Sequence, residues 1–389
     1  MKMPKSIFLL TFASFATGTE AYVYTAHLQT LANDMGVSLV EAGQLASVFA
    51  ITCAITAPII SNLTASVARK LTIALGLFFI GVLNIAAAYA ASFEALVAIR
   101  IACGLAAGLV GPASSAFAAE LAPPEKRAQA MALVLTGMTL AFILGIPTGS
   151  IVGDYFGWQG SFIYAGSIAL LAGLLVTFAA PLKAVLDQRV IRLREIAVIK
   201  PLIVPLSLTI LGFAATFSLI AYLGPVTQHI TGASGHGIGF MQSMIGVGSI
   251  FGIIAGFRAA KNPSRRFIIV SFFITALSIG SASVLMLMPM HPALSQMIFA
   301  LSIITGAAAL FSRTPVIQTL LVQRAGAQRS VALALNSSAV FIGQGLGAVI
   351  SGITISAFSI SYLGMAGAVI GVIGICTVIA FVKSPQPHV

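Results

Sequence analysis

Long apolar runs alternate with short polar gaps along the whole chain. A membrane-spanning helix needs about 20 mainly apolar residues, and twelve runs reach that length. They lie at roughly 6–31, 41–64, 71–92, 95–120, 128–155, 159–181, 201–228, 237–258, 267–288, 292–322, 330–358 and 362–382. Little of the chain remains outside them. The pattern therefore predicts an all-α integral membrane protein with twelve transmembrane helices and no sizeable soluble domain.

The composition agrees with this prediction. Hydrophobic residues make up 59% of the chain and charged residues 7%, and the mean hydropathy is +1.06, far outside the range of soluble domains. A pI near 10.0 would suggest nucleic-acid binding only if the basic residues formed a stripe on a soluble surface. Here they are divided among short loops, so we expect a lipid bilayer as partner and no nucleic acid.

The charges give the predicted orientation. Of the twenty Lys and Arg residues, eighteen fall in every second gap between the apolar runs, and two, Arg100 and Arg313, fall inside runs. Short cytoplasmic loops carry the Lys and Arg excess, so both termini are predicted to be cytoplasmic. The nine acids end at Glu195. The three cysteines all lie within runs and show no metal or disulfide spacing, so we expect no metal and no cofactor.

The chain divides into two related halves. Shifting the sequence by 202 residues places KRAQAMAL (126–133) on QRSVALAL (328–335), and Gly145 on Gly347. Parallel repeats of this kind are a transporter architecture. We predict two pseudo-symmetric six-helix bundles, at 1–181 and 201–389, joined by a cytoplasmic linker at 182–200, the longest polar stretch.

Three segments carry a family resemblance, namely AIRIACGLAAG (98–108), ELAPPEKRAQAMAL (120–133) and LGIPTGSIVGDYFGWQGSF (144–162). Together they resemble the major facilitator superfamily and, more narrowly, its twelve-span drug:proton antiporter branch, which includes arabinose-type and purine-type efflux permeases. The resemblance implies the major facilitator fold, a proton gradient as the energy source, a monomer, and the bacterial cytoplasmic (inner) membrane. The loop SNLTASVARK (61–70) departs from the family pattern, because it keeps only Arg69 and Lys70.

The resemblance also implies roles for particular residues. Arg100 corresponds to the membrane-embedded arginine of the fourth span, and Gly145, Pro147 and Gly149 correspond to the antiporter motif of the fifth. Gly153 extends that series of small residues, which let helices approach closely. In the family the fifth and eighth spans face each other across the two halves, so a smooth glycine surface there would permit rocking. Static helix packing is the alternative.

Glu20 is the acid in the interior of the first apolar run. At 1.5 Å rise per residue, Glu20 lies roughly 21 Å from Ser6, at the cytoplasmic end of its run. Arg100 lies roughly 9 Å from Glu94, at the opposite side of the membrane, so both residues are predicted to lie at about the same depth. The two side chains could therefore pair. Embedded charges are costly and usually functional, so we predict that Glu20 carries the coupled proton and that Arg100 is its partner. The alternatives are a buried polar network without titration, or direct contact with substrate.

Arg313 has no acid in its own half of the chain. It could meet Glu20, bind a ligand, or extend towards cytoplasmic water. The three embedded charges sum to +1, which favours neutral or anionic substrates over cations. Tyr24, Tyr222, Gln242 and Asn336 are further candidates for substrate contact, with helix–helix hydrogen bonding as the alternative.

The histidines are scattered along the chain. His27 lies near the outer end of the first run, where it could respond to external pH. His229, His236 and His291 are expected in solvated loops on the same side.

These features predict a secondary active transporter, namely a proton-coupled exporter (antiporter) of a small neutral or anionic organic solute or drug that works by alternating access. A proton-coupled importer or a uniporter of the same solutes is the first alternative. A membrane-embedded receptor or enzyme is disfavoured, because the second half lacks acids and the histidines do not converge.

Overall fold

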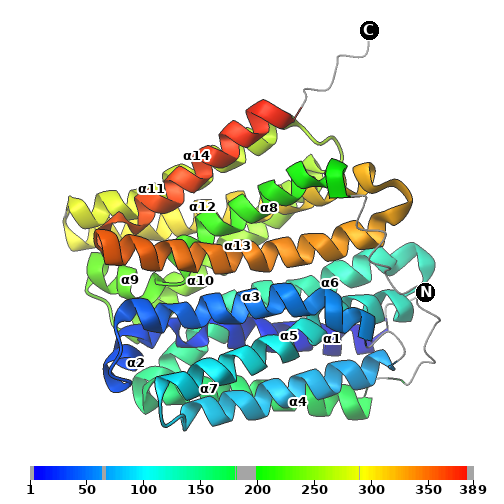
Figure 1. The fold of residues 1–389 in the computed structure, drawn as a ribbon, viewed down its shortest axis with the longest axis horizontal. Coiled ribbons are helices and arrows are strands. Elements are labelled where there is room, and N and C mark those ends of the chain that lie inside the picture. The colour runs from blue at the N-terminus through cyan, green and yellow to red at the C-terminus, as the bar shows by residue number, and fades with distance from the viewer. Residues whose placement is uncertain (1–3, 64–66, 180, 182–198, 289, 383–389) are drawn as a thin grey trace. The chain divides into compact units, whose positions relative to one another are not determined.

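The computed structural model describes residues 4–63, 67–179, 181, 199–288 and 290–382, and all regular structure in these residues is helical (Figure 1). Ten stretches of the described chain are long and apolar enough to cross a membrane. One of them, Pro124–Phe178, is 55 residues long and holds two spans. The first predicted run contributes another span, which is divided into shorter helices. The predicted all-α fold of twelve spans is confirmed.

The described residues form two compact units. The first comprises residues 4–179 and 181 together with Ser234–Ser243, and the second comprises residues 199–233 and 244–382. The predicted linker lies outside the described residues, except for its last two positions, 199 and 200. The predicted division into bundles at 1–181 and 201–389 stays a prediction.

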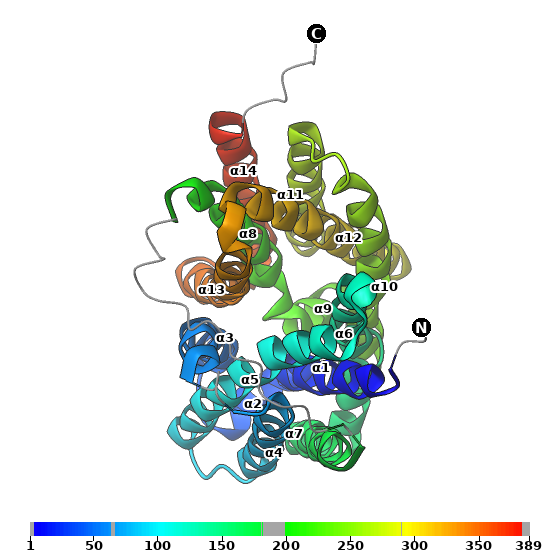
Figure 2. The same cartoon turned by 90° about the vertical axis from the view of Figure 1, so that its right-hand side faces the viewer.

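The first unit contains the spans of the first half. Its elements are α1 (Ser6–Tyr22), η1 (Val23–His27), α2 (Leu28–Asp34), α3 (Leu39–Leu63), α4 (Arg69–Ala88), α5 (Phe93–Leu121), η2 (Pro124–Lys126), α6 (Arg127–Leu140), η3 (Ala141–Gly145) and α7 (Ile146–Ala179). Helix α1 packs against α5, α6 and α7, and α4 packs between α5 and α7 (Figure 2). The interior of this unit therefore lies around α1 and α5.

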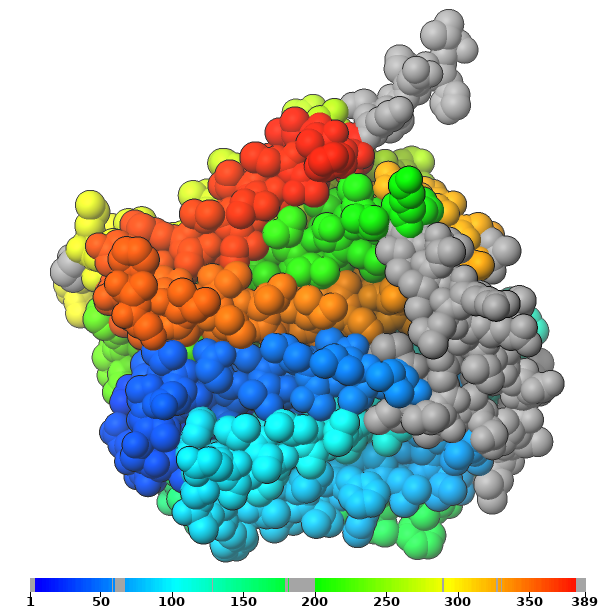
Figure 3. Space-filling model, in the orientation of Figure 1, coloured from blue at the N-terminus to red at the C-terminus, as the bar shows by residue number. Residues whose placement is uncertain are grey.

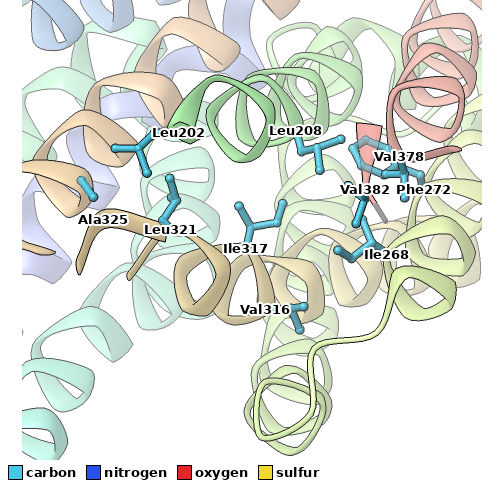
Figure 4. Packing of buried hydrophobic residues seen from close by; sticks show 11 residues of the cluster. Leu202, Leu208, Ile268, Phe272, Val316, Ile317, Leu321, Ala325, Val378 and Val382 are labelled. Atoms are coloured by element: carbon cyan, nitrogen blue, oxygen red, sulfur yellow. The ribbon is translucent and has the colours of Figure 1, made fainter. Parts of the chain in front are cut away.

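The second unit contains the remaining spans. Its elements are α8 (Ile199–Ile220), α9 (Leu223–Thr231), α10 (Gly235–Ala259), α11 (Arg265–Leu287), α12 (Pro292–Ala325), η5 (Gly326–Gln328), α13 (Arg329–Ala357), η6 (Ile360–Tyr362) and α14 (Leu363–Phe381). Helix α8 packs against α12, α13 and α14. Leu208, Phe272, Ile317 and Val378 belong to an apolar cluster that joins α8, α11, α12 and α14 (Figure 4).

Two irregularities in the fifth and sixth spans follow from single residues. Pro147 has no N–H to donate, and the five residues before Ile146 form a π-helical turn, η3. Further along, Gly157 adopts φ 73° and ψ 175° inside α7, a region of backbone conformation that is essentially restricted to glycine. Gly157 thus divides α7 between the predicted runs 128–155 and 159–181.

The outer faces of many helices carry large apolar side chains. Phe78 and Phe79 of α4 are each about half exposed (52% and 51%), and the surface of α4 and α5 is visible in Figure 3. An exposed apolar surface of this extent has to be shielded from water. In a chain of membrane-spanning helices, lipid acyl chains provide that shielding.

Candidate functional site: a buried ion pair and its polar surroundings

A salt bridge between α1 and α5 lies at the centre of the first unit. Arg100 Nη1 donates to Glu20 Oε1 at 2.6 Å, and both side chains are fully buried (0% exposed). The structure therefore brings together the two residues that were expected to lie at the same depth. An ion pair buried in this way is stable only if its hydrogen bonding is good. The 2.6 Å hydrogen bond to Glu20 meets that condition for Nη1 of the Arg100 guanidinium.

Aromatic rings enclose the guanidinium. Arg100 Cζ lies 4.5 Å from the centroid of the Phe49 ring and 5.1 Å from that of Tyr24. Tyr24 in turn stacks on Phe162, with ring centroids 5.3 Å apart. Cation–π contacts of this kind favour a desolvated arginine. Tyr24, predicted as a substrate contact, is thus fully buried as a wall of the ion-pair site.

The helix that carries Glu20 changes its geometry just beyond that residue. Tyr22 has φ −135° and ψ 6°, and the chain continues as the 3₁₀ helix η1. Arg100 Nη2 donates to the Ala21 carbonyl at 3.3 Å, at the end of α1. Short 3₁₀ segments inside a span often mark hinges. Arg100 therefore contacts both Glu20, the acid buried within α1, and the backbone joint between α1 and η1.

A second polar group links η1, α7 and the start of α10 within the first unit. Ser150 Oγ donates to Gln242 Oε1 at 2.6 Å, and Gln242 Nε2 donates to Thr25 Oγ1 at 3.1 Å. His27 Nε2 donates to the Ser150 carbonyl at 2.9 Å. Gln242, predicted as a substrate contact, is buried and makes two hydrogen bonds in this network. Sequence reasoning missed Thr25 and Ser150, because Ser and Thr are common within spans.

An ion pair lies one helical turn beyond Ser150. Asp154 Oδ2 is 2.5 Å from His236 Nδ1, and the Tyr155 and His236 rings meet edge to face with centroids 5.7 Å apart. This contact corrects the expectation of a merely solvated loop histidine at position 236. The sequence offered one signal for it, since Asp154 is the acid at the outer end of the antiporter motif.

Gly145 of η3 and two glycines of α7, Gly149 and Gly153, face α1 and η1. A Cβ atom built on Gly145, Gly149 or Gly153 would collide with Thr19, Val23 or His27, respectively. The face of α7 that meets the start of α10 instead carries Pro147, Ser150 and Asp154, with Gly239 opposite Pro147.

The glycines of α10 likewise pack inside their own unit. Gly248, Gly252 and Gly256 lie against Ile304, Ala308 and Ser312 of α12. Both glycine series therefore provide close packing within a unit. These contacts fit the alternative of static helix packing, and a role of the glycines in rocking stays a prediction.

The embedded cation of the second unit has a different environment. Arg313 on α12 is 1% exposed, and its Nη1 lies 3.4 Å from both Ser271 Oγ and Thr275 Oγ1 of α11. Its Cζ lies 3.8 Å from the centroid of the Phe272 ring. The side chain therefore does not extend to water, which removes that alternative.

The other two predicted substrate contacts lie on different helices of the second unit. Tyr222 is fully buried at the junction of α8 and α9, where a break matches that of the first span. Asn336 on α13 is 3% exposed and accepts a hydrogen bond from Thr209 Oγ1 of α8 at 2.8 Å. As the structure stands, Asn336 joins two helices.

Twelve spans with charged side chains buried in the interior are typical of a membrane transporter. The family comparison agrees, because residues 8–280 match the model of the Major Facilitator Superfamily. The chain belongs to that superfamily, whose members are transporters rather than enzymes.

Similar proteins cover nearly the whole chain. The inner membrane transport protein YdhP of Escherichia coli (strain K12) is 28% identical over 399 residues, covering 100% of this chain and 98% of that protein. A chloramphenicol resistance protein of Streptomyces lividans is 29% identical over 365 residues, covering 91% and 90%. The crystal structure of a D-xylose–proton symporter has the same fold, with a TM-score of 0.76, 18% identity, and coverage of 97% of this chain and 98% of that one.

Proposed function

We propose that this protein is a proton-coupled antiporter that exports a small neutral or anionic organic solute from the cell by alternating access. The observation that carries the proposal is the buried ion pair of Glu20 and Arg100 between α1 and α5. A carboxylate in this position can take up one proton and release it elsewhere if its surroundings alternate between the two sides of the membrane. One charge moved across the membrane is worth about 2.3 kcal/mol per 100 mV.

The proton acts by changing the charge balance at Arg100. When Glu20 is a carboxylate, the pair is neutral; when Glu20 accepts a proton, the guanidinium keeps its charge without a counter-ion. Because Arg100 also bonds to the Ala21 carbonyl at the joint between α1 and η1, protonation alters the contact that holds this joint.

The glycines of η3 and α7 transmit that change. Gly145, Gly149 and Gly153 let η3 and α7 lie directly on α1 and η1, so a movement at the joint shifts α7. Pro147 and the π turn before it make α7 deformable at this level. Ser150 and Asp154 on α7 then gain or lose their contacts with Gln242 and His236. We propose this as the gating role of the antiporter motif.

Two observations support the substrate class. The embedded charges Glu20, Arg100 and Arg313 sum to +1, which disfavours organic cations. The similar chloramphenicol resistance protein is named for a neutral organic antibiotic. We further propose the bacterial inner membrane with cytoplasmic termini, because the basic residues gather in alternate loops.

Transport of labelled chloramphenicol into proteoliposomes tests the proposal. With an acidic interior, protons leave and an antiporter accumulates the solute inside; a protonophore abolishes that accumulation. We expect Glu20→Gln to lose accumulation and to keep downhill exchange. Glu94→Gln, at an exposed acid near the start of α5, is the matched control and keeps both activities.

The same assay separates the alternatives. Accumulation driven by an alkaline interior would indicate symport, and transport that ignores the gradient would indicate a uniporter. If chloramphenicol is not transported, labelled sugars, nucleosides and organic acids are tested in the same vesicles. An unchanged pH dependence in Glu20→Gln for any transported solute would contradict proton coupling through Glu20.

A further inference from the structure

Arg313 is a buried cation in a unit without acids. None of the residues after Glu195 is an Asp or Glu, so no side chain of residues 196–389 can balance its charge. The other Lys and Arg residues of the described second unit lie at the ends of helices or in the turns between them. They are Lys200, Arg258, Lys261, Arg265, Arg266, Arg324 and Arg329. Among the described residues of the second unit, Arg313 is the one charged side chain that lies in the interior.

The contacts that Arg313 makes solvate its charge only weakly. Both hydroxyl contacts, to Ser271 and Thr275, are long at 3.4 Å. The Phe272 ring below Cζ belongs to the apolar cluster of α8, α11, α12 and α14 (Figure 4). A cation–π contact does not neutralise a charge. A charge buried without a partner is strongly unfavourable, so the arginine needs a counter-ion from outside the chain.

One nitrogen of the guanidinium has no acceptor within the described chain. Nη2 is buried and has no hydrogen-bond partner among the described residues, whereas Nη1 is held by the two hydroxyls. Gly212 of α8 lies beside Nη2, and a Cβ atom there would come within 2.5 Å of Nη2 and 3.0 Å of Nε. The absence of a side chain at position 212 thus lets the backbone of α8 lie close to the guanidinium, while Nη2 stays without an acceptor among the described residues.

We propose that Arg313 binds a monovalent anion through Nη2 and its neighbouring N–H groups, held in place by Ser271, Thr275 and Phe272. One unit of negative charge balances the one cation, and the absence of a second interior cation in the described part of this unit disfavours a dianion such as sulfate. The same chemistry fits a resident chloride ion or the carboxylate of a transported solute. The carboxylate case rests on the proposed function, and the chloride case does not.

Anion binding to the purified full-length protein tests this site. The protein is kept in neutral detergent with sulfate as the only anion, and sulfate is then replaced by chloride or by benzoate at constant pH and ionic strength. The readouts are the thermal unfolding midpoint and equilibrium binding of radiolabelled chloride or benzoate. We expect saturable binding of one anion per chain and a rise of several degrees in the midpoint.

Variants assign the effect to the guanidinium. Arg313→Met is expected to lose the anion-dependent shift, and Arg313→Lys to bind at least 10-fold more weakly. Arg324→Met removes an exposed cation from the same helix and serves as the control that keeps the shift. Benzoate that displaces chloride shows that a carboxylate can use the site; chloride binding without competition assigns it to a resident ion.

Two results would overturn the site. The first is an equal anion response in the parent protein and Arg313→Met. The second needs no variant: no saturable binding of either anion to the parent protein. Neither result touches proton exchange, which is measured through Glu20 in vesicles, so the failure of the anion site and the failure of the proposed function are distinguishable.

Discussion

Arg100 and Arg313 are both fully buried arginines on membrane-spanning helices, but each unit balances its arginine differently. In the first unit Arg100 holds Glu20 at 2.6 Å and a backbone carbonyl at 3.3 Å. In the second unit Arg313 has two hydroxyls at 3.4 Å and an aromatic ring. The first arginine has a titratable partner within the chain, and the second has none among the described residues.

This difference suits the two units to different roles in binding charged species. A carboxylate beside an arginine can change its charge by binding a proton, so the first unit is suited to proton coupling. An arginine that lacks an acid can change its charge balance only by binding an anion. If both proposals hold, the first unit responds to a proton and the second to an anion.

Removing Arg100 is expected to have the largest effect on stability. Arg100→Met leaves the Glu20 carboxylate buried without its partner, and loss of one member of a buried pair typically costs about 3–5 kcal/mol. Denaturant unfolding of the purified variant measures this. The double variant Glu20→Gln/Arg100→Met is expected to regain part of the loss, because no charge is left unbalanced. A double variant as unstable as Arg100→Met would show that the arginine acts through packing.

Removing Arg313 is expected to act in the opposite direction. In a buffer with sulfate as the only anion, Arg313→Met replaces an unbalanced buried charge by an apolar side chain. Replacing even a balanced buried ion pair by apolar residues is often stabilising by about 1–4 kcal/mol, so we expect a gain of at least about 1 kcal/mol here. The same unfolding measurement checks the sign. Destabilisation as large as that of Arg100→Met would mean that the contacts of Arg313 outweigh the cost of burying its charge, and the contrast between the two arginines would disappear.

Adding a methyl group at Gly212 probes the space beside Arg313. Gly212→Ala is expected to cost about 1–3 kcal/mol, because the new Cβ meets Nη2 and Nε of the guanidinium. In the Arg313→Met background the cost should fall. Gly111→Ala on α5, where a Cβ would meet no atom within 4 Å, is the control. An equal cost in both backgrounds would assign the clash to atoms other than those of Arg313.

The smallest expected effect concerns Asp154 and His236. Their side chains meet at the start of α10, where His236 is half exposed and water screens the contact. Removing the carboxylate is therefore expected to cost at most about 1 kcal/mol. Comparing the unfolding of the parent protein and Asp154→Asn at one pH measures it. A loss as large as that of Arg100→Met would show that this contact is worth far more than an exposed pair.

Much of the fold followed from the sequence because lipid imposes simple rules. A backbone in hydrocarbon must satisfy its own hydrogen bonds, so each long apolar run is a helix. The division of α7 at Gly157 agrees with the gap between two predicted runs. The depths of Glu20 and Arg100 also followed, since rise per residue fixes depth along a helix.

The partners of those residues were decided by the tertiary structure. Depth alone left Glu20 free to pair with either arginine, and only the packing of α1 on α5 selected Arg100. Spacing in fours placed the glycines of η3 and α7 on one face of the fifth span but did not say which helix that face meets, because many neighbours accept a smooth surface.

The sequence by itself thus determined the number of spans, the depth of each embedded charge and the absence of acids after Glu195, since these depend on order along the chain and on the properties of lipid. The structure alone decided that Arg100 is paired within the chain while Nη2 of Arg313 is left without a partner. Pairing depends on how each helix is rotated about its axis, and that rotation is fixed by the side-chain packing of helices distant in sequence.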